Sequence, residues 1–313
     1  MWKKNILYYI IKREVSHEGS ERMHNYLRSI GFKNLAKKKD LDILINDIIK
    51  NPDHKIITED AEGNVFAELS KEYGESIGIA VCGEYIEDTF QMDYYYPYFK
   101  GNGITTEEKV EVERHSDREA YVGVCDEVRI GITLIFYLQN VIEYLQETGS
   151  IAKRIPVNTT LSALSSGGKI VFPIYKNESQ IKSGENYNQK RSHLIAAARD
   201  GDEEAIESLT LEDIDTYSMI SKRVMKEDIL SIVDTYFMPY GIESDQYSIM
   251  GEILNFYTVE NSVTSEKSYV MTVESNNLVF DVCINQEDLL GEPAIGRRFK
   301  GTIWMQGRIN YHI

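Results

Sequence analysis

The feature that most constrains this chain is a change of hydrophobic period at Lys55. From Lys55 to Val128 apolar and polar residues alternate, and turn residues such as Glu62-Gly63-Asn64 and Lys100-Gly101-Asn102-Gly103 interrupt the alternation at short intervals. Alternation with a period of two places every second side chain on one face of a sheet, and closely spaced turns favour antiparallel neighbours. The segment is therefore predicted to be an antiparallel meander.

Segments with helical spacing lie on both sides of the meander. Residues 21–30 and 40–50 carry apolar side chains every three or four positions, and residues 130–144 form the most apolar stretch of the chain. All three are predicted to be helices. Ser165-Ser166-Gly167-Gly168 lies between two apolar runs and is predicted to be the turn of a hairpin.

The second half has the reverse order, with helices first and strands later. Three helices are predicted at 189–199, 202–209 and 211–225, the last with Thr210 and Asp213 as a capping box. The predicted strands that follow are 229–238, 247–257, 268–273, 278–284 and 298–305, with a short helix at 286–290.

These elements predict an α+β fold in two domains. A length of 313 residues suits two units of roughly 100–200 residues each. The first, residues 1–182, would be an antiparallel sheet packed with helices. The second, residues 183–313, would be a helical segment followed by a small OB-like β-barrel, with the polar stretch 176–189 as the linker.

The charge of the chain is strongly acidic and unevenly distributed. Residues 1–182 hold 28 acidic and 23 basic side chains, whereas residues 183–313 hold 22 and 11, which gives the net charge of −16. Nucleic acid is bound mainly by lysine and arginine at its phosphates, so this field disfavours DNA and RNA as partners.

Cysteine usage predicts reduced cysteines, and hydropathy predicts a soluble protein. Cys82, Cys125 and Cys283 are far apart in apolar sequence, so they are expected to be reduced and buried. Neither a C-x-x-C nor an H-x-x-H pair occurs, and we expect no metal and no cofactor. No run of about 18 uncharged apolar residues occurs, which predicts a cytoplasmic protein without a membrane span.

A basic and aromatic cluster near the end of the chain is the most conspicuous candidate site. Residues 296–308 combine glycines with positive charge in an acidic half. As a functional site, they would form an anion- or nucleotide-binding face made of Arg297, Arg298, Lys300 and Trp304. The structural alternative pairs the cations with Asp281, Glu287, Asp288 and Glu292 and places Trp304 in the core.

Other patterns have a simpler structural explanation. The acidic cluster from Asp200 to Glu207 lacks the ligand spacing of an EF-hand and suits the first turn of a helix. Ser165 to Lys169 lacks the first glycine and the final hydroxyl of a phosphate loop. The tyrosine-rich run from Tyr94 to Phe99 either lines a pocket or divides between two faces of a sheet. No catalytic residue is assigned.

Three segments together resemble a known family. They are Asp200 to Thr210, the Met238-Pro239-Tyr240-Gly241 turn, and Cys283-Ile284-Asn285 through to Arg308. Over nearly its whole length the chain is similar to a family of uncharacterised proteins, with a domain of unknown function, from clostridial bacteria. The resemblance implies a bacterial cytoplasmic protein and no particular chemistry.

Three hypotheses for function remain open. The first is a non-enzymatic protein that binds an unknown protein or small molecule. Assembly into a homo-oligomer is also left open. The second is a hydrolase or transferase whose carboxylates meet in an interdomain cleft, near His115 or His193. The third is binding of nucleotides or single strands by the C-terminal barrel through Arg297, Arg298 and Trp304.

Overall fold

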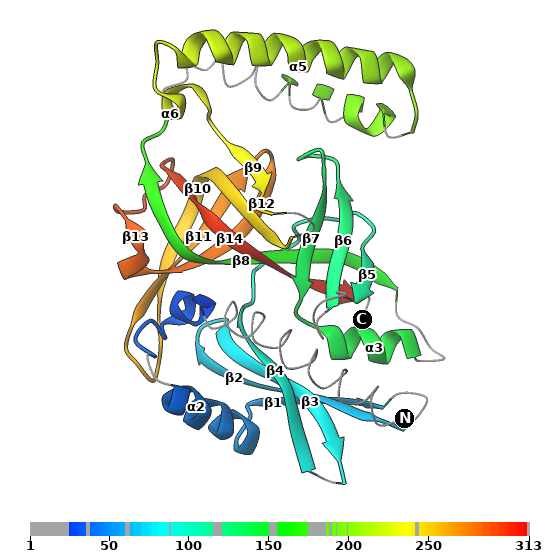
Figure 1. The fold of residues 1–313 in the computed structure, drawn as a ribbon, viewed down its shortest axis with the longest axis vertical. Helices are drawn as coiled ribbons and strands as arrows, with labels where there is room; N and C mark the ends of the chain where they lie inside the picture. Colours follow the sequence, from blue (N-terminus) through cyan, green and yellow to red (C-terminus); the bar gives the residue numbers. More distant parts are fainter. Residues whose placement is uncertain are drawn as a thin grey trace, which may run out of the picture.

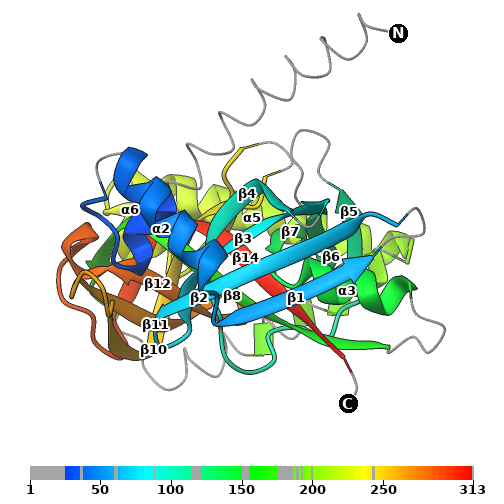
Figure 2. The same cartoon turned by 90° about the horizontal axis from the view of Figure 1, so that it is seen from below.

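The protein is built from two β-sheets and a small number of helices. The computed structural model describes residues 25–35, 38–59, 63–87, 89–114, 121–149, 155–174, 186–187, 190–191, 193–198, 200–241 and 244–311. Figure 1 shows the smaller sheet A at the bottom, the larger sheet B in the middle and the long helix α5 (Glu203–Val224) at the top. Figure 2, the view from below, shows the first strands of sheet A running across sheet B.

Sheet A is an antiparallel meander of four strands that follow one another in the chain. Tight turns join its middle strands, and Ser76 adopts a left-handed conformation with φ 62° in one of them. The alternating sequence therefore predicted this part of the meander correctly. Its strands are β1 (His54–Glu59), β2 (Val65–Gly74), β3 (Ile77–Ile86) and β4 (Thr89–Phe99).

Sheet B contains the other ten strands, in the order β13-β8-β12-β11-β10-β14-β7-β6-β5, with β9 paired to β10 and β14 also paired to β8. The sheet is mixed, because β8 runs parallel to β12 and β13, and β14 runs parallel to β7. Its strands are β5 (Glu111–Arg114), β6 (Tyr121–Glu127), β7 (Ile132–Leu138), β8 (Pro156–Val171), β9 (Tyr236–Pro239), β10 (Gln246–Glu260), β11 (Lys267–Ser275), β12 (Leu278–Asn285), β13 (Leu289–Leu290) and β14 (Arg298–Tyr311).

The predicted α+β class is wrong, because the described chain is mostly β. The predicted meander is divided: its first strands form sheet A, whereas β5 and β6 belong to sheet B. The predicted C-terminal unit is not a separate OB-like barrel either, because its strands share one sheet with β5, β6, β7 and β8. Alternation identifies a strand but does not identify its partners, which are set by contacts distant in sequence.

Strand pairing crosses the proposed domain boundary. Strand β8 precedes residue 182, and it pairs with β12, β13 and β14, all of which follow residue 183. The division into domains 1–182 and 183–313 stays a prediction, but the sheet itself is continuous between the two halves of the chain.

The apolar segment 130–144 contains a strand and the start of a helix, and not the single helix predicted. Strand β7 is followed by α3 (Val141–Gly149). Leu134, Phe136 and Leu138 are buried at alternate positions, and Tyr137 is buried on the other face. A strand buried on both faces has a continuous apolar sequence, and such a run also satisfies the spacing expected of a helix.

Strand β8 also differs from its prediction, because it continues through Ser165 to Gly168 without the expected hairpin turn. Its partner β14 runs antiparallel along almost its whole length. Gly168 therefore marks a place where the two strands approach closely, and not a reversal of the chain.

Helices α2 (Lys38–Lys50) and α3 both contact strands of sheet A. Helix α2 buries Ile45 and Ile48 in the core that it shares with sheet A. Helix α5 is continuous, although two helices were predicted, because Thr210 donates its hydroxyl to the Ile206 carbonyl at 2.8 Å and does not cap a new helix. The short helical turns are η1 (Arg28–Ile30), α6 (Ile229–Ile232) and η2 (Gln286–Asp288).

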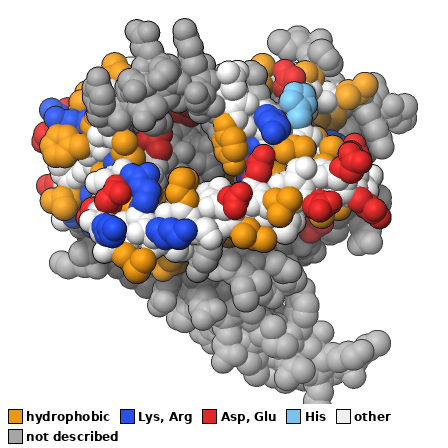
Figure 3. All heavy atoms as spheres, turned by 90° about the horizontal axis from the view of Figure 1, so that it is seen from above, with side chains coloured by type: hydrophobic (Ala, Val, Ile, Leu, Met, Phe, Trp, Pro, Cys, Tyr) orange, Lys and Arg blue, Asp and Glu red, His pale blue; other side chains and the backbone are white. Residues whose placement is uncertain are grey.

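Charge along α5 complements the helix dipole. Asp202 caps its first turn by accepting hydrogen bonds from the Glu204 and Ala205 amides at 3.0 and 3.1 Å. Figure 3, the view from above, shows acidic side chains gathered at one end and basic ones at the other. Acidic residues near a helix N-terminus and basic residues near its C-terminus are both stabilising.

The cysteines agree with the prediction made from composition. All three cysteines are buried and free, as predicted. Within the part of the chain that is described, no helix combines the length and the apolar character needed to cross a bilayer.

Sheets A and B meet across a buried layer of aromatic and amide side chains. The Tyr137 ring lies 4.8 Å from Tyr96 of sheet A and 5.1 Å from Trp304, centroid to centroid. Gln306 is fully buried between the sheets; its Oε1 accepts from the Phe99 amide at 3.2 Å, and its Nε2 donates to the Pro97 carbonyl at 2.9 Å. Both bonds join β14 to the end of β4.

We expect Gln306→Leu to destabilise the protein, because the shape changes little while polar groups of β4 lose their partners. Each buried group left unsatisfied costs about 1–3 kcal/mol of the free energy of unfolding. Chemical denaturation measures the loss, and Gln91→Leu on the exposed part of β4 is the matched control. Equal stability of the two variants would contradict a role of Gln306 in joining the sheets.

Candidate functional site

Arg298 of the predicted basic face is buried and has a structural role. Its side chain donates to the Phe172 carbonyl from Nε at 3.0 Å, to the Leu230 carbonyl from Nη2 at 2.7 Å and to the Val233 carbonyl from Nη1 at 2.8 Å. Burial lowers the pKa of its guanidinium. Arg298 therefore fastens the end of β8 and the α6 segment to β14 and does not reach the surface.

Trp304 also lies inside the protein, as the structural alternative required. Its side chain is buried with 2% exposed, and its indole Nε1 donates to Asp245 Oδ2 at 2.7 Å. The ring packs between Tyr26, at 5.2 Å, and Tyr137. No face of the indole is open for a base to stack on.

The other two predicted residues are more open but lie in different surroundings. Arg297 donates to the Glu292 carbonyl at 2.8 Å, and its guanidinium lies 5.5 Å from the centre of the Phe172 ring. Lys300 lies with its Nζ 5.8 Å from the Tyr236 ring centre. The structure therefore does not bring the four residues together as one face.

Alternation along β14 explains this separation. Phe299, Ile303 and Met305 point into the core of sheet B. The even-numbered residues point away from that core: Trp304 and Gln306 are covered by sheet A, whereas Lys300 and Thr302 stay partly exposed. One strand therefore supplies both a buried interface and an open surface.

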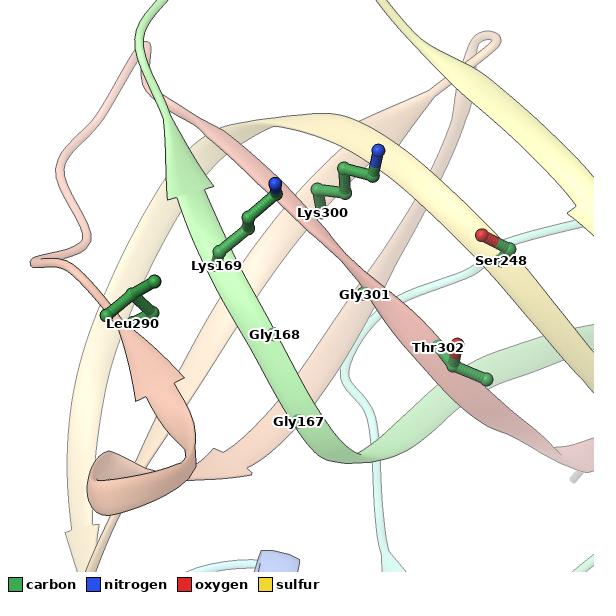
Figure 4. Close-up of a pocket in the computed structure, with 8 residues that line it drawn as sticks. All are labelled: Gly167, Gly168, Lys169, Ser248, Leu290, Lys300, Gly301 and Thr302. Atoms are coloured by element: carbon green, nitrogen blue, oxygen red, sulfur yellow. The ribbon is translucent and has the colours of Figure 1, made fainter.

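The open part of β14 lies in a shallow depression on sheet B (Figure 4). Strand register places Lys300 directly opposite Lys169 of β8 and Thr302 directly opposite Ser248 of β10. The depression is lined by Gly167, Gly168, Lys169, Ser248, Leu290, Lys300, Gly301 and Thr302.

The paired lysines are the main electrostatic feature of the depression. Side chains directly opposite on antiparallel strands have Cβ atoms about 4.5–5.5 Å apart, and like charges there destabilise the pair. Among the described residues, no carboxylate forms an ion pair with Lys169 or with Lys300. Two positive charges are therefore held side by side without an internal counterion in this part of the structure.

A β-bulge shapes the floor of the depression. Between the pairs Gly168–Gly301 and Ser165–Ile303, β8 has two residues where β14 has only Thr302. The Ser165 hydroxyl, 2.9 Å from the Thr302 carbonyl, donates to it across the bulge. Bulges interrupt the ladder and redirect side chains, and they are frequent beside binding sites.

Packing requires glycine at some positions of the depression and not at others. A Cβ at Gly301 would lie 2.7 Å from the Phe299 ring, and a Cβ at Gly168 would collide with the same ring, so both are required by packing. A Cβ at Gly167 would meet no atom within 4 Å, and its φ is not left-handed. Packing therefore does not explain glycine at position 167, where a side chain would fill the depression.

The chemistry available in the depression suits binding of an anion. Two ammonium groups and the hydroxyls of Ser248 and Thr302 can all donate hydrogen bonds to negatively charged oxygen. None of the eight lining side chains is a histidine, cysteine or carboxylate, the usual general bases and metal ligands. The arrangement offers positive charge and hydrogen-bond donors without a histidine, cysteine or carboxylate.

Sequence reasoning found Lys300, rejected Lys169 as part of a phosphate loop, and missed Ser248 and Thr302. A signal was present, since Gly167-Gly168-Lys169 and Lys300-Gly301-Thr302 both place a lysine beside glycine. The first pattern was interpreted as the end of a hairpin turn, and nothing local indicated that the two would become neighbours.

The other sequence candidates lie elsewhere. His115 is outside the described residues, and His193 is exposed. No group of three His, Cys, Asp or Glu side chains that could hold a metal occurs in the described ranges. Of the tyrosine-rich run, Tyr95, Tyr96 and Tyr98 are buried in the core around sheet A.

The comparisons with known proteins identify a family but no activity. A family model described as "Domain of unknown function, E. rectale Gene description (DUF3881)" matches residues 27–307. Neither the curated proteins nor the solved structures gave a match. The matched range covers most of the 313 residues and confirms the resemblance to clostridial proteins with a domain of unknown function. The chain belongs to the DUF3881 family.

Proposed function

We propose that this protein is a non-enzymatic binding protein that holds a small anionic ligand over Lys169 and Lys300. The observation that carries the proposal is the direct opposition of these two lysines on β8 and β14, without a carboxylate partner among the described residues. A bound anion would offset their repulsion, and it would supply the counterion that neighbouring side chains do not provide.

The favoured ligand class is a compact phosphate or phosphomonoester. Its oxygens can accept from both ammonium groups and from the hydroxyls of Ser248 and Thr302 at the same time. A long polyanion is a poorer fit, because the protein carries a net charge of −16 and would repel the part that extends beyond the depression. Screening over roughly 8–10 Å lets a local positive site attract a small anion within an acidic surface.

The lining residues favour binding over turnover. A phosphate held by two lysines and two hydroxyls would have no histidine, cysteine or carboxylate among the eight residues that surround it to activate a hydroxyl or a water molecule. This supports the first of the sequence hypotheses, a binding protein, and gives it a ligand class.

Titration with phosphate tests the proposal. We expect orthophosphate or pyrophosphate to bind at low ionic strength, and Lys300→Ala to weaken binding tenfold or more, because a charge-assisted hydrogen bond contributes about 1.5–3 kcal/mol. Calorimetry measures both affinities. Lys109→Ala is the control, because Lys109 is exposed and pairs with Glu111 far from the depression in sequence. Unchanged affinity in Lys300→Ala, or no binding to the wild type, would rule the site out.

Charge reversal at Lys169 should affect the stability of the protein and its binding of phosphate in different ways. Lys169→Glu replaces a repulsive cross-strand pair with an attractive one, which contributes roughly 0.2–1 kcal/mol. Without ligand, we expect the variant to unfold at the same or higher denaturant concentration than the wild type, and to lose phosphate binding. Clear destabilisation without phosphate would show that the lysine pair is not strained and would remove the main support for the proposal.

Two neighbouring glycines provide a further test. Gly167→Val fills open space in the depression, so we expect weaker phosphate binding with little change in stability. Gly168→Ala places a Cβ against the Phe299 ring, and overpacking of this kind costs about 1–3 kcal/mol. Calorimetry and thermal unfolding distinguish the two effects. Full phosphate affinity in Gly167→Val would place the ligand elsewhere.

A further inference from the structure

A carboxyl group lies in the interface between the two sheets, remote in sequence from the proposed anion site. Glu68 of β2, Cys82 of β3 and Tyr94 of β4 form one cross-strand row, by the register of sheet A. Tyr96 lies one position further along the same face of β4 and packs on Tyr137 of sheet B. The row therefore belongs to the face of sheet A that meets sheet B.

The hydrogen bonds around Glu68 require more protons than the phenol can supply. The Tyr96 hydroxyl lies 2.8 Å from the Gln139 carbonyl and 3.1 Å from Glu68 Oε2, and both are acceptors when Glu68 is ionised. A phenol has one proton. The Cys82 thiol, 3.8 Å from the same carboxyl oxygen, is only a weak donor. A proton on Glu68 satisfies both contacts, because Glu68 then donates to Tyr96, which donates to Gln139.

We propose that Glu68 carries a proton in the folded protein at weakly acidic pH and releases it near neutral pH, and that loss of this proton loosens the contact between sheets A and B. The carboxyl group is thus a pH-sensitive latch. When Glu68 ionises, it competes with the Gln139 carbonyl for the single Tyr96 proton. One buried acceptor is then left unpaired at the interface.

The Gln139 carbonyl belongs to a wider contact between the sheets. The Gln139 side chain donates from Nε2 to the Phe99 carbonyl and to Gln306 Oε1, each at 2.8 Å. Gln306 also accepts from the Phe99 amide. Any shift of Gln139 away from Tyr96 therefore acts on the bonds that join β4 to β14.

Electrostatics supports this assignment. Burial raises the pKa of Glu68 to about 7, although hydrogen bonds from Tyr96 and Cys82 and the positive charges of Arg308 and Lys100 act in the opposite direction. Burial also raises the pKa of Cys82, Tyr94, Tyr96 and Tyr137 well above their ordinary values, so these neighbours stay neutral. Arg308 is itself paired with Glu143 of α3 at 3.1 Å.

The direction of the pH effect follows from linkage. The unfolded chain releases this proton near the ordinary glutamate pKa of 4.5, and the folded protein releases it at about 7. Between these values the folded state binds more protons than the unfolded state. Stability contributed by Glu68 is therefore present below 4.5, falls as pH rises through the window and is lost above about 7.

The test compares Glu68→Gln with the wild type between about pH 5 and pH 8. Glutamine can donate to Tyr96 without titrating. We expect the folding equilibrium constant of the wild type to fall relative to Glu68→Gln by up to about tenfold per pH unit within the window. Glu84→Gln is the matched control, because Glu84 lies on the same face of sheet A one row away. Its pH profile should follow that of the wild type.

Two direct measurements complete the design. The carboxyl carbon-13 shift of Glu68 should titrate near neutral pH, and a transition at the ordinary glutamate value would overturn the proposal. Hydrogen exchange of the Phe99 amide, corrected for its intrinsic rate, reports on the sheet contact. Its protection should fall with rising pH in the wild type and not in Glu68→Gln. Equal pH dependence in both would overturn the latch even if Glu68 titrates as expected.

Discussion

The structure depends on the position of β14, which pairs with β10, β8 and β7 in one sheet. Its odd-numbered side chains fill the core of sheet B, while Trp304 and Gln306 lie under sheet A. Backbone hydrogen bonds to neighbouring strands on both edges stabilise β14. Burial on both faces further stabilises the part of the strand around residues 303–306. Both proposed sites are consequences of this arrangement.

The open half of β14 forms the proposed anion site. Lys300 and Thr302 are aligned there with Lys169 and Ser248 by the strand register. Arg298 is drawn inward instead, and its guanidinium satisfies main-chain carbonyls at the end of β8 and in the α6 segment. Arg298 and Lys300 are separated by one residue and lie on the same face of β14, but Arg298 has a structural role, whereas Lys300 would be available to the proposed ligand.

The covered half of β14 forms the contact that the Glu68 latch would regulate. Gln306 links β14 to Phe99 and Gln139, and Gln139 in turn links to Tyr96 and Glu68. The network crosses between sheets whose strands are far apart in the chain. Buried polar networks of this kind stabilise a contact only while every member is satisfied, so one proton can decide how firmly the sheets are held.

The sequence by itself determined the positions of most strands, the burial of the cysteines and the acidic first turn of α5, because alternation, hydropathy and charge near the start of a helix are local properties. It could not distinguish the doubly buried strand β7 from a helix. Nor could it reveal that β8 continues through its glycines to pair with β14. Only the tertiary structure decided which strands are neighbours, and hence that Lys169 faces Lys300 and Glu68 meets Tyr96. The reason is physical: strand register and sheet packing are set by contacts between distant residues, and no local pattern records them.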